Sequence, residues 1–561
     1  MLKRWDGEEA SEAQAGDPRR RLVLIGLDAC DPLTVRRMAA AGKLPHIARF
    51  MDTAARCPVR NPYGLFVGAT WANFATGATP DRHGFYCWNE IDRSSYACRL
   101  KPPEISHPFF WHAVGKAGRR VALIDIPHAG FPDAVNGTAI AEWGCHDRHY
   151  GFHTQPPGRA AALAERFGLH PALGEDPYAV RDFAPDDHVH RVGRSRGVAE
   201  LKALLDGLLA GVRAKSRLVS AVFEEEAWDL FVAVFGEAHA AGHQLWHLHD
   251  PLHPEFDAEA RRALGGDPIE AIYRALDEAV GALVARADPG ATFMLLLSHG
   301  MGLHNDGTLV LAEILRRLEI VYRGGAGRLS PRDLFRRGSQ ALLPVADRAA
   351  AALSVPERLR RSLGRKLGAR QFGTAGERRR QAFFAAPNNH VFGGVRFNLA
   401  GREAGGWVSE AEMAALAERI EQDLRALVNA DTGRPVVRAV TRADRFFRRT
   451  AGDSMPDLFV DWNRSAPIEA VRSATIGTVR APYDYWRTGD HRPGGLLLAR
   501  APDLPAGRPL PRIKMEDIPV TLAARLGVAL ENVDGAAIPW LGGAPLQPSA
   551  AGASPARERH S

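Results

Sequence analysis

The chain has 561 residues, a formal net charge of +7, 45% hydrophobic and 24% charged residues, which is ordinary for a soluble globular protein with a large core. No apolar run approaches the roughly 18 residues of a membrane span, and the polar N-terminus lacks the apolar stretch of a secretory signal. Five cysteines without a CxxC pair argue against a disulfide framework or a cysteine zinc site. We therefore expect a cytoplasmic protein with no membrane span.

Short apolar runs alternate with helical patterns between two expected flexible tails, residues 1–20 and 543–561. In chain order the pattern predicts a strand at Leu22–Leu27, helices at 33–41 and 44–51, a strand at 121–126, a helix at 198–212, a strand at Leu230–Phe235, a helix at 269–286 and a strand at Thr292–Leu297. Such alternation indicates an α/β protein with a central, mostly parallel sheet that carries these four strands as inner neighbours.

The basic charge is concentrated in one segment. Residues 323–380 hold fifteen Lys and Arg against four Asp and Glu, a local net charge of +11, so the rest of the chain sums to −4. We expect a helical insertion outside the sheet, and the alternative is a patch that binds nucleic acid, anionic lipid or a phosphorylated substrate. The segment has only two aromatic residues, Phe335 and Phe372, which argues against nucleic acid as a partner.

Residues at strand ends are candidates for a metal site, because α/β sheets bind ligands beyond the carboxyl ends of their strands. Asp28 follows the first strand, His239 and His243 follow the third, and His299 follows the fourth. His491 precedes a late strand-like run. Carboxylates and imidazoles that converge from separate segments are what a divalent metal needs, although each histidine alone could be a hydrogen-bonded structural residue.

The order of motifs resembles the alkaline phosphatase superfamily, specifically the type I phosphodiesterase/nucleotide pyrophosphatase family, over residues 21–542. The motifs that carry the resemblance are Leu24-Ile-Gly-Leu-Asp28, Leu44-Pro-His-Ile-Ala48, Trp71-Ala-Asn-Phe-Ala-Thr-Gly77, Pro80-Asp-Arg-His-Gly84, His239-x-x-x-His243, Ser298-His-Gly-Met301, Asn398-Leu-Ala-Gly-Arg-Glu403, Met455-Pro-Asp-Leu458, His491-Arg-Pro-x-Gly495 and Asp517-Ile-Pro-Val-Thr521. The resemblance implies one domain over 21–542 with the three-layer sandwich of the superfamily, a central mostly parallel sheet and helical insertions.

The resemblance also implies two metal ions, usually zinc, on either side of a Thr or Ser nucleophile. The carried-over ligands are Asp28, His239, His243, His299 and His491. Glu237, Ser298 and His146 are additional candidates for the site. Zinc is expected, as one ion or two, with manganese as the alternative.

Three positions depart from the family pattern. His239 stands where the family has Asp and remains a competent ligand, whereas Ser298 replaces the Asp of the Asp-His pair and is a poor ligand. Val67 occupies the position of the nucleophile. Thr70 is the nearest hydroxyl and could be the nucleophile, or only the N-cap of the helix that follows.

The sequence leaves three functions open. The first is a metal-dependent hydrolase of phosphate esters, most of all phosphodiesters or nucleotide-like compounds, with Thr70 or water as the nucleophile. The second is a catalytically silent relative that binds an anionic ligand, because Val67 and Ser298 occupy catalytic positions. The third is a scaffold or nucleic-acid-associated protein that works through residues 323–380. A small phosphorylated substrate is the expected partner, and the oligomeric state is not predicted.

Overall fold

The computed structural model describes residues 21–100, 104–131, 133–145, 149–172, 197–324, 373–389, 391–450, 452–480 and 487–541. The basic segment 323–380 lies mostly outside these residues. Helix α11 (Thr308–Tyr322) ends just before this segment, and helix α14 (Ala375–Arg380) forms the end of it that is described. The two predicted tails lie outside the described residues too, and the domain limits of 21–542 stay a prediction.

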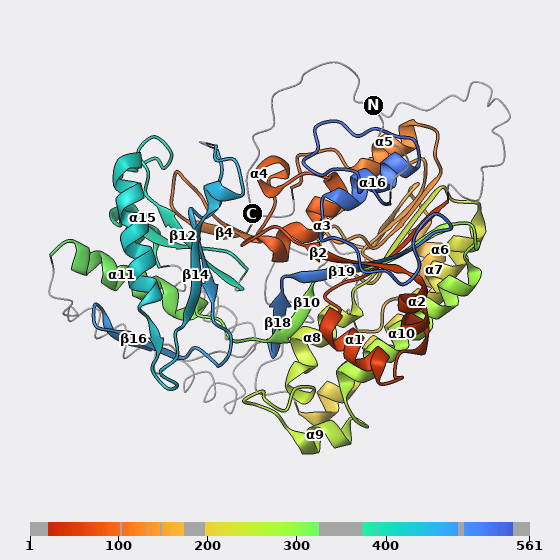
Figure 1. Cartoon of the computed structure of the whole chain (residues 1–561), viewed down its shortest axis with the longest axis horizontal. Helices are drawn as coiled ribbons and strands as arrows, with labels where there is room; N and C mark the ends of the chain where they lie inside the picture. Colours follow the sequence, from red (N-terminus) through yellow and green to blue (C-terminus); the bar gives the residue numbers. More distant parts are fainter. Residues whose placement is uncertain are drawn as a thin grey trace.

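A nine-stranded sheet forms the centre of the larger part of the molecule (Figure 1). Its inner strands run in the order β9 (Thr292–Leu297), β1 (Leu22–Leu27), β8 (Leu230–Phe235) and β5 (Val121–Ile124), and all three neighbouring pairs are parallel. The prediction that these four runs are inner neighbours is confirmed. β5 ends two residues earlier than predicted, and Asp125 there has a positive φ of 52° that turns the chain away from the sheet.

Shorter strands extend both edges of this sheet. On one side β6 (Gly137–Ala141) pairs parallel to β5, and β7 (His153–Gln155) pairs antiparallel to β6. On the other side β19 (Gly494–Arg500) pairs antiparallel to β9 and to β2 (Ala55–Arg60), and β20 (Ile513–Lys514) closes the edge. The sheet is therefore mixed at its edges and parallel at its centre.

Helices cover both faces because side chains alternate along each inner strand. Val23, Ile25 and Leu27 pack into one apolar cluster, and Leu22 and Leu24 into another. The first face is covered by α1 (Pro32–Ala40), α2 (Pro45–Thr53), α7 (Val198–Glu225), α8 (Glu237–Leu245) and α10 (Pro268–Arg286), and the second by α3 (Phe66–Thr76), α5 (Phe110–Lys116) and α16 (Asp517–Arg525). The structure thus has the three-layer, alkaline-phosphatase-like arrangement that the sequence predicts.

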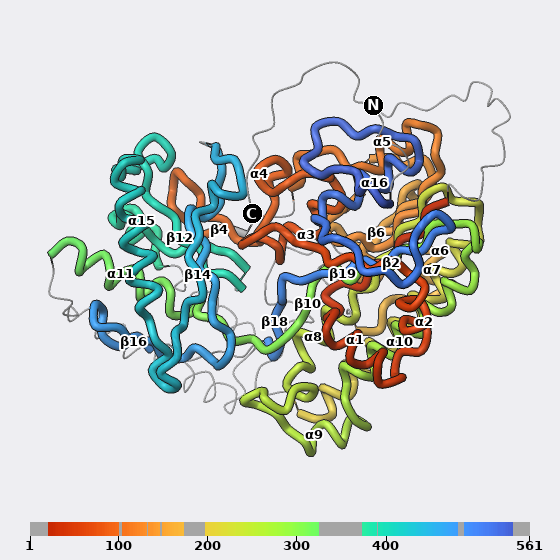
Figure 2. The backbone as a smooth tube through the Cα atoms, viewed as in Figure 1, coloured from red at the N-terminus to blue at the C-terminus, as the bar shows by residue number. Residues whose placement is uncertain are grey.

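A second lobe stands beside the main sheet, at the left of Figures 1 and 2. Its antiparallel sheet has the order β11 (Phe383–Ala386), β12 (Phe392–Phe397), β15 (Leu458–Trp462) and β14 (Val437–Arg442). Helices α11 and α15 (Glu410–Arg425) share an apolar cluster with this sheet. Sequence periodicity did not single out these strands.

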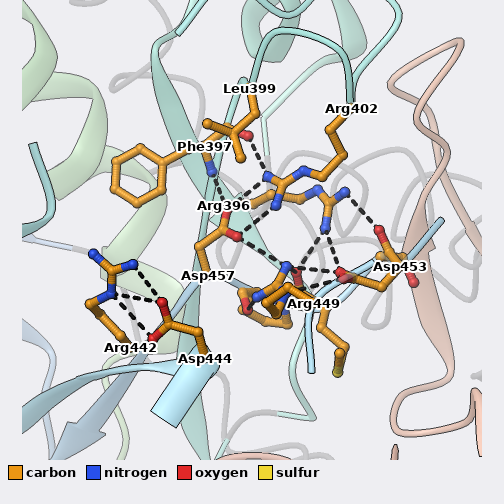
Figure 3. A network of polar contacts seen from close by, with 12 residues as sticks. Arg396, Phe397, Leu399, Arg402, Arg442, Asp444, Arg449, Asp453 and Asp457 are labelled. Atoms are coloured by element: carbon orange, nitrogen blue, oxygen red, sulfur yellow. Dashed lines mark hydrogen bonds and ion pairs between the residues drawn. The ribbon is translucent and has the colours of Figure 1, made fainter. Parts of the chain in front are cut away.

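Two motifs of the sequence meet in this lobe in a network of ion pairs (Figure 3). Both terminal nitrogens of Arg402 donate to Asp457, at 2.7 and 2.8 Å, and Arg449 lies 3.0 Å from the same carboxylate. Arg396 donates to Glu403 at 2.6 Å, and both of these side chains are buried. The motif residues 398–403 and 455–458 therefore hold a loop against β15, which is a structural role.

Helix α3 begins earlier than the sequence suggests. Gly64 has a φ of +76°, and a Cβ there would lie 2.5 Å from the ring of Phe459, so only glycine fits this turn. The helix then starts at Phe66, with Leu65 as a cap residue that makes no side-chain bond. Thr70 lies in the interior of the helix, and the prediction that it is the N-cap is wrong.

Candidate functional site

Five of the predicted site residues lie together at the carboxyl ends of the central strands. Asp28 follows β1, helix α8 carries His239 and His243 just after β8, and His299 follows β9. His491 lies on β18 (Gly489–Arg492), which pairs with β10 (Gly300–Leu303), the strand just after His299. All five side chains belong to buried residues, the most exposed being His239 at 9%.

Three histidines form the centre of this site. His239 and His243 are four residues apart on α8 and therefore lie on one helix face, and their Nε2 atoms are 3.0 Å apart. The ring of His491 lies 4.7 Å from that of His239 and 4.6 Å from that of His243. One nitrogen of each imidazole falls within 4.8 Å of the other two, which is close enough for one metal ion to bind all three.

Hydrogen bonds define which nitrogens of the α8 pair carry protons. His239 Nδ1 lies 2.6 Å from Asp28 Oδ2, and His243 Nδ1 lies 2.8 Å from the carbonyl of Gly489. A carboxylate and a carbonyl only accept, so both Nδ1 atoms must donate. In neutral imidazoles the two Nε2 atoms then face each other as lone pairs, an arrangement that needs a proton or a metal ion between them. An Nδ1–H bonded to a carboxylate or carbonyl is also how metal-binding histidines are oriented.

Asp28 bonds to side chains from three segments of the chain. Trp71 Nε1 donates to its Oδ1 at 2.7 Å, Ser298 Oγ donates to the same oxygen at 3.0 Å, and His239 Nδ1 bonds Oδ2. Burial would raise the pKa of Asp28, but the neighbouring His239 and His299 and the donated bonds hold it well below its usual value. The carboxylate is therefore charged and oriented toward His239.

His299 completes the cluster on the β9 side. Its ring lies 4.5 Å from that of His491 and 5.8 Å from that of Phe66, and its Nε2 is 3.6 Å from Asp28 Oδ1, too far for a hydrogen bond. Burial lowers the pKa of His299 to about 4 even though Asp28 opposes this. The imidazole is therefore neutral near pH 7 and has a lone pair available for a metal.

We expect the metal-free protein to lose stability on mild acidification. Burial lowers the pKa of six described histidines, to about 3 for His83 and about 4 for His247, His253 and His299, and also for His107 and His112. Each of these takes up a proton near pH 6.5 when unfolded but only at lower pH when folded. The free energy of unfolding should therefore fall as pH drops from about 6.5 to 4, by up to about 1.4 kcal/mol per pH unit for each group.

Three described groups should instead stabilise the folded protein as the pH falls, because their pKa is raised by folding: Glu319, Glu516 and His304. These three groups are fewer than the six histidines, so the free energy of unfolding should still fall as the pH drops. Urea unfolding at about pH 7, 6 and 5 measures this free energy. A midpoint that stays constant or rises as the pH falls would contradict this prediction.

Thr70, the predicted nucleophile, lies inside helix α3 and not at its N-terminus. Thr70 is fully buried, and its hydroxyl lies 2.7 Å from the carbonyl of Phe66 and 3.1 Å from Asn61 Oδ1. Val67, at the family's nucleophile position, packs beside an apolar cluster that includes Phe66 and Phe392. Neither residue therefore offers an unengaged hydroxyl at the start of α3.

The additional candidates have separate places. Ser298 Oγ bonds Asp28 and accepts from the backbone N–H of Ala29 at 3.2 Å. Glu237 contacts another buried residue, with its Oε1 lying 3.2 Å from His170 Nε2. Burial would raise the pKa of Glu237, but Lys215 and His170 hold it below its usual value. His146 lies outside the described residues.

Sequence reasoning missed several residues that shape the site. Trp71 and Phe66 contact Asp28 and the histidine rings from α3, and nothing in their spacing indicated this. A second buried group, His304, Asp306 and Asp490, also brings three possible ligand atoms within 4.8 Å of one another. The short His-Asn-Asp run at 304–306, soon after Ser298-His-Gly-Met301, was the signal that could have identified it.

The fold and the site define an alkaline-phosphatase-like α/β protein whose His and Asp clusters could hold a divalent metal. The model of the type I phosphodiesterase/nucleotide pyrophosphatase family matches residues 22–362, and the chain belongs to this family. The resemblance found in the sequence motifs is thereby confirmed. No curated protein matches the chain. Among the described residues, we find no helix with the length and hydrophobicity needed to traverse a bilayer.

Two solved structures to which the chain is similar share little sequence identity with it. Phosphonoacetate hydrolase from Sinorhizobium meliloti 1021, in complex with phosphonoacetate, is 14% identical, with a TM-score of 0.48 over 91% of this chain and 96% of that chain. Murine ectonucleotide pyrophosphatase/phosphodiesterase 5 is 9% identical, with a TM-score of 0.46 over 92% of this chain and 97% of that chain.

Proposed function

We propose that the protein is a hydrolase of phosphate esters, with phosphodiesters or nucleotide-like compounds as substrates, that uses one divalent ion held by His239, His243 and His491. The observation that carries this proposal is the pair of Nε2 atoms of His239 and His243, 3.0 Å apart, each with its Nδ1 bonded to an acceptor. Zinc suits three imidazoles best, and manganese is the alternative. A small phosphorylated substrate and a cytoplasmic location belong to the same proposal.

A divalent ion in this position would act as a Lewis acid on a phosphoryl oxygen and would lower the pKa of water. The chain's own residues set up the centre. Asp28 and the carbonyl of Gly489 orient the imidazoles of His239 and His243, and Phe66 covers the rings of His299 and His491. Asp28 thus orients His239 and does not itself bind the ion.

We propose one ion rather than two because Asp28 and Ser298 are engaged with each other. In the two-ion arrangement of the family, Asp28, an Asp in place of Ser298, His299 and the nucleophile would bind the second ion. Here Trp71 and Ser298 donate to Asp28 Oδ1, so these bonds replace the second ion. Water is then the nucleophile, since Thr70 is engaged within α3 and Val67 has no hydroxyl.

A second candidate is a catalytically silent relative that binds an anionic ligand. Val67 at the nucleophile position and Ser298 at a ligand position favour it. In that case the histidine pair would share a proton instead of an ion.

The test combines metal analysis with turnover of bis-p-nitrophenyl phosphate. We expect one equivalent of ion per chain, no turnover after chelation, and recovery on addition of zinc or manganese. Thr70→Val should keep both ion and turnover and lose roughly 1–3 kcal/mol of stability, because it removes a buried hydroxyl that lies within hydrogen-bond distance of Asn61 Oδ1 and the Phe66 carbonyl.

Two outcomes would contradict the proposal. A Thr70→Val protein that keeps its ion but cannot turn over, with phosphothreonine at position 70 trapped in the wild type, would make Thr70 the nucleophile. A wild type that binds no ion and shows no turnover with any added divalent metal would favour the silent relative.

A further inference from the structure

The backbone of His491 is held by side chains on either side of it. Its N–H donates to Asp490 Oδ1 at 2.8 Å, and Arg464 Nη1 donates to its carbonyl at 2.7 Å. His491 lies in a two-stranded sheet, where β18 pairs with β10. Because that sheet is so small, these side-chain bonds add support that a wider sheet would supply through further strands.

Asp490 is in turn held by a buried ionic cluster. His304 Nε2 lies 2.7 Å from Asp306 Oδ2 and 3.3 Å from Asp490 Oδ2, and these three residues are at most 4% exposed. His304 Nδ1 lies 3.0 Å from the carbonyl of Arg487, which can only accept. His304 Nδ1 therefore donates to that carbonyl, and its Nε2 faces the carboxylates of Asp306 and Asp490.

The charges around the cluster argue against a second metal ion there. Besides His304, two guanidinium groups lie nearby: Arg487 Nη1 is 3.7 Å from Asp490 Oδ1, and Arg464 has Asp490 and Asp306 among its anionic neighbours. Two guanidinium groups thus already face two carboxylates. A divalent ion would add positive charge where none is needed.

We propose that Asp490 and Arg464 are positioning residues of the histidine centre: they fix the backbone of His491 so that its imidazole meets His239 and His243, and His304 with Asp306 holds Asp490 in place. This inference rests on the proposed function. Arg464 follows β15, so it comes from the second lobe, whereas His491 contributes to the site on the main sheet. Figure 2 shows β10 and β18 in the region between that lobe and α8. The second lobe thereby sets the geometry of the centre.

The experiment replaces Arg464 and compares it with a matched arginine of the same lobe. Arg464→Met removes the donor to His491, and Arg464→Lys restores a charge and a donor. Arg438→Met is the control, because Arg438 belongs to the same lobe and its guanidinium pairs with Asp461 on the neighbouring strand. Three measurements are made: hydrogen exchange of the peptide that spans β18 in metal-free protein, zinc affinity by competition with a fluorescent chelator, and the urea midpoint.

We expect Arg464→Met to speed exchange in the β18 peptide and to weaken zinc binding about 10- to 100-fold, as loss of an orienting group does. Arg464→Lys should recover part of both, and Arg438→Met should leave both unchanged. Asp490→Asn, which removes the charge but keeps an acceptor, should weaken zinc binding less than Arg464→Met. Similar urea midpoints for Arg464→Met and Arg438→Met would separate positioning from general destabilisation.

Unchanged exchange in Arg464→Met, or faster exchange with wild-type zinc affinity, would overturn the inference. Two zinc equivalents in the wild type, one of them lost in His304→Gln, would also overturn it and make the cluster a metal site. If the wild type binds neither zinc nor manganese and shows no turnover with either, the proposed function has failed, and unaltered exchange in Arg464→Met would then reject the positioning role separately.

Discussion

Replacing His243 by alanine is expected to remove the bound ion and to lower phosphodiester turnover roughly 10³-fold, because a Lewis acid supplies several kcal/mol of transition-state stabilisation. His243 is 1% exposed, and its Nε2 faces that of His239 at 3.0 Å, so the change removes one of the three imidazoles of the proposed centre. Metal content per chain and turnover of bis-p-nitrophenyl phosphate, measured on the same sample, check the prediction.

His249→Ala is the matched control for this variant. His249 lies just beyond α8, and its Nδ1 bonds Asp267 Oδ2 at 2.7 Å instead of joining the histidine cluster. It should keep the ion and the turnover of the wild type. If His243→Ala retained a full equivalent of ion, the three-histidine centre would be wrong. If it lost the ion yet kept its turnover, catalysis would lie elsewhere.

Lys215→Met is expected to lower the free energy of unfolding by about 3–5 kcal/mol, because it leaves buried carboxylates without their cation. Lys215 Nζ lies 2.7 Å from Asp125 Oδ2 and 3.3 Å from the carbonyl of Gly144, and both charged side chains are fully buried. Asp125 in turn accepts from the backbone N–H groups of Trp143 and Gly144. Urea unfolding of the variant measures the loss.

Lys202→Met supplies the control on the same helix, since Lys202 pairs with Asp206 at the surface and should change stability by less than about 0.5 kcal/mol. Adding Asp125→Asn to Lys215→Met should recover part of the loss, because the amide carries no charge to leave unpaired. Equal urea midpoints for Lys215→Met and Lys202→Met would show that Lys215 contributes no net stability.

The two parts of the candidate centre differ in how far they depart from the family pattern. Where the family has Asp-x-x-x-His, the change to His239 keeps a residue type that can bind a metal, and the late His491 is retained. Where the family has an Asp-His pair, Ser298 turns a ligand into a donor to Asp28. Both substituted residues, His239 and Ser298, bond the carboxylate of Asp28.

The sequence by itself determined the central sheet and the convergence of the histidines. Continuous apolar runs such as Leu22–Leu27 and Leu230–Phe235 can be buried on both faces only as inner parallel strands. Once those strands are parallel, residues that follow them meet at one edge, which brings Asp28, His239 and His299 together. Local pattern was sufficient for both.

Only the tertiary structure decided how these residues are used. Trp71 donates to Asp28 across 43 residues of chain, and Asn61 bonds Thr70 because a turn at Gly64 starts α3 at Phe66. Arg464 reaches His491 from another lobe. Such bonds depend on which elements pack against each other and on how side chains point after packing, and the spacing of residues along a chain carries no record of either.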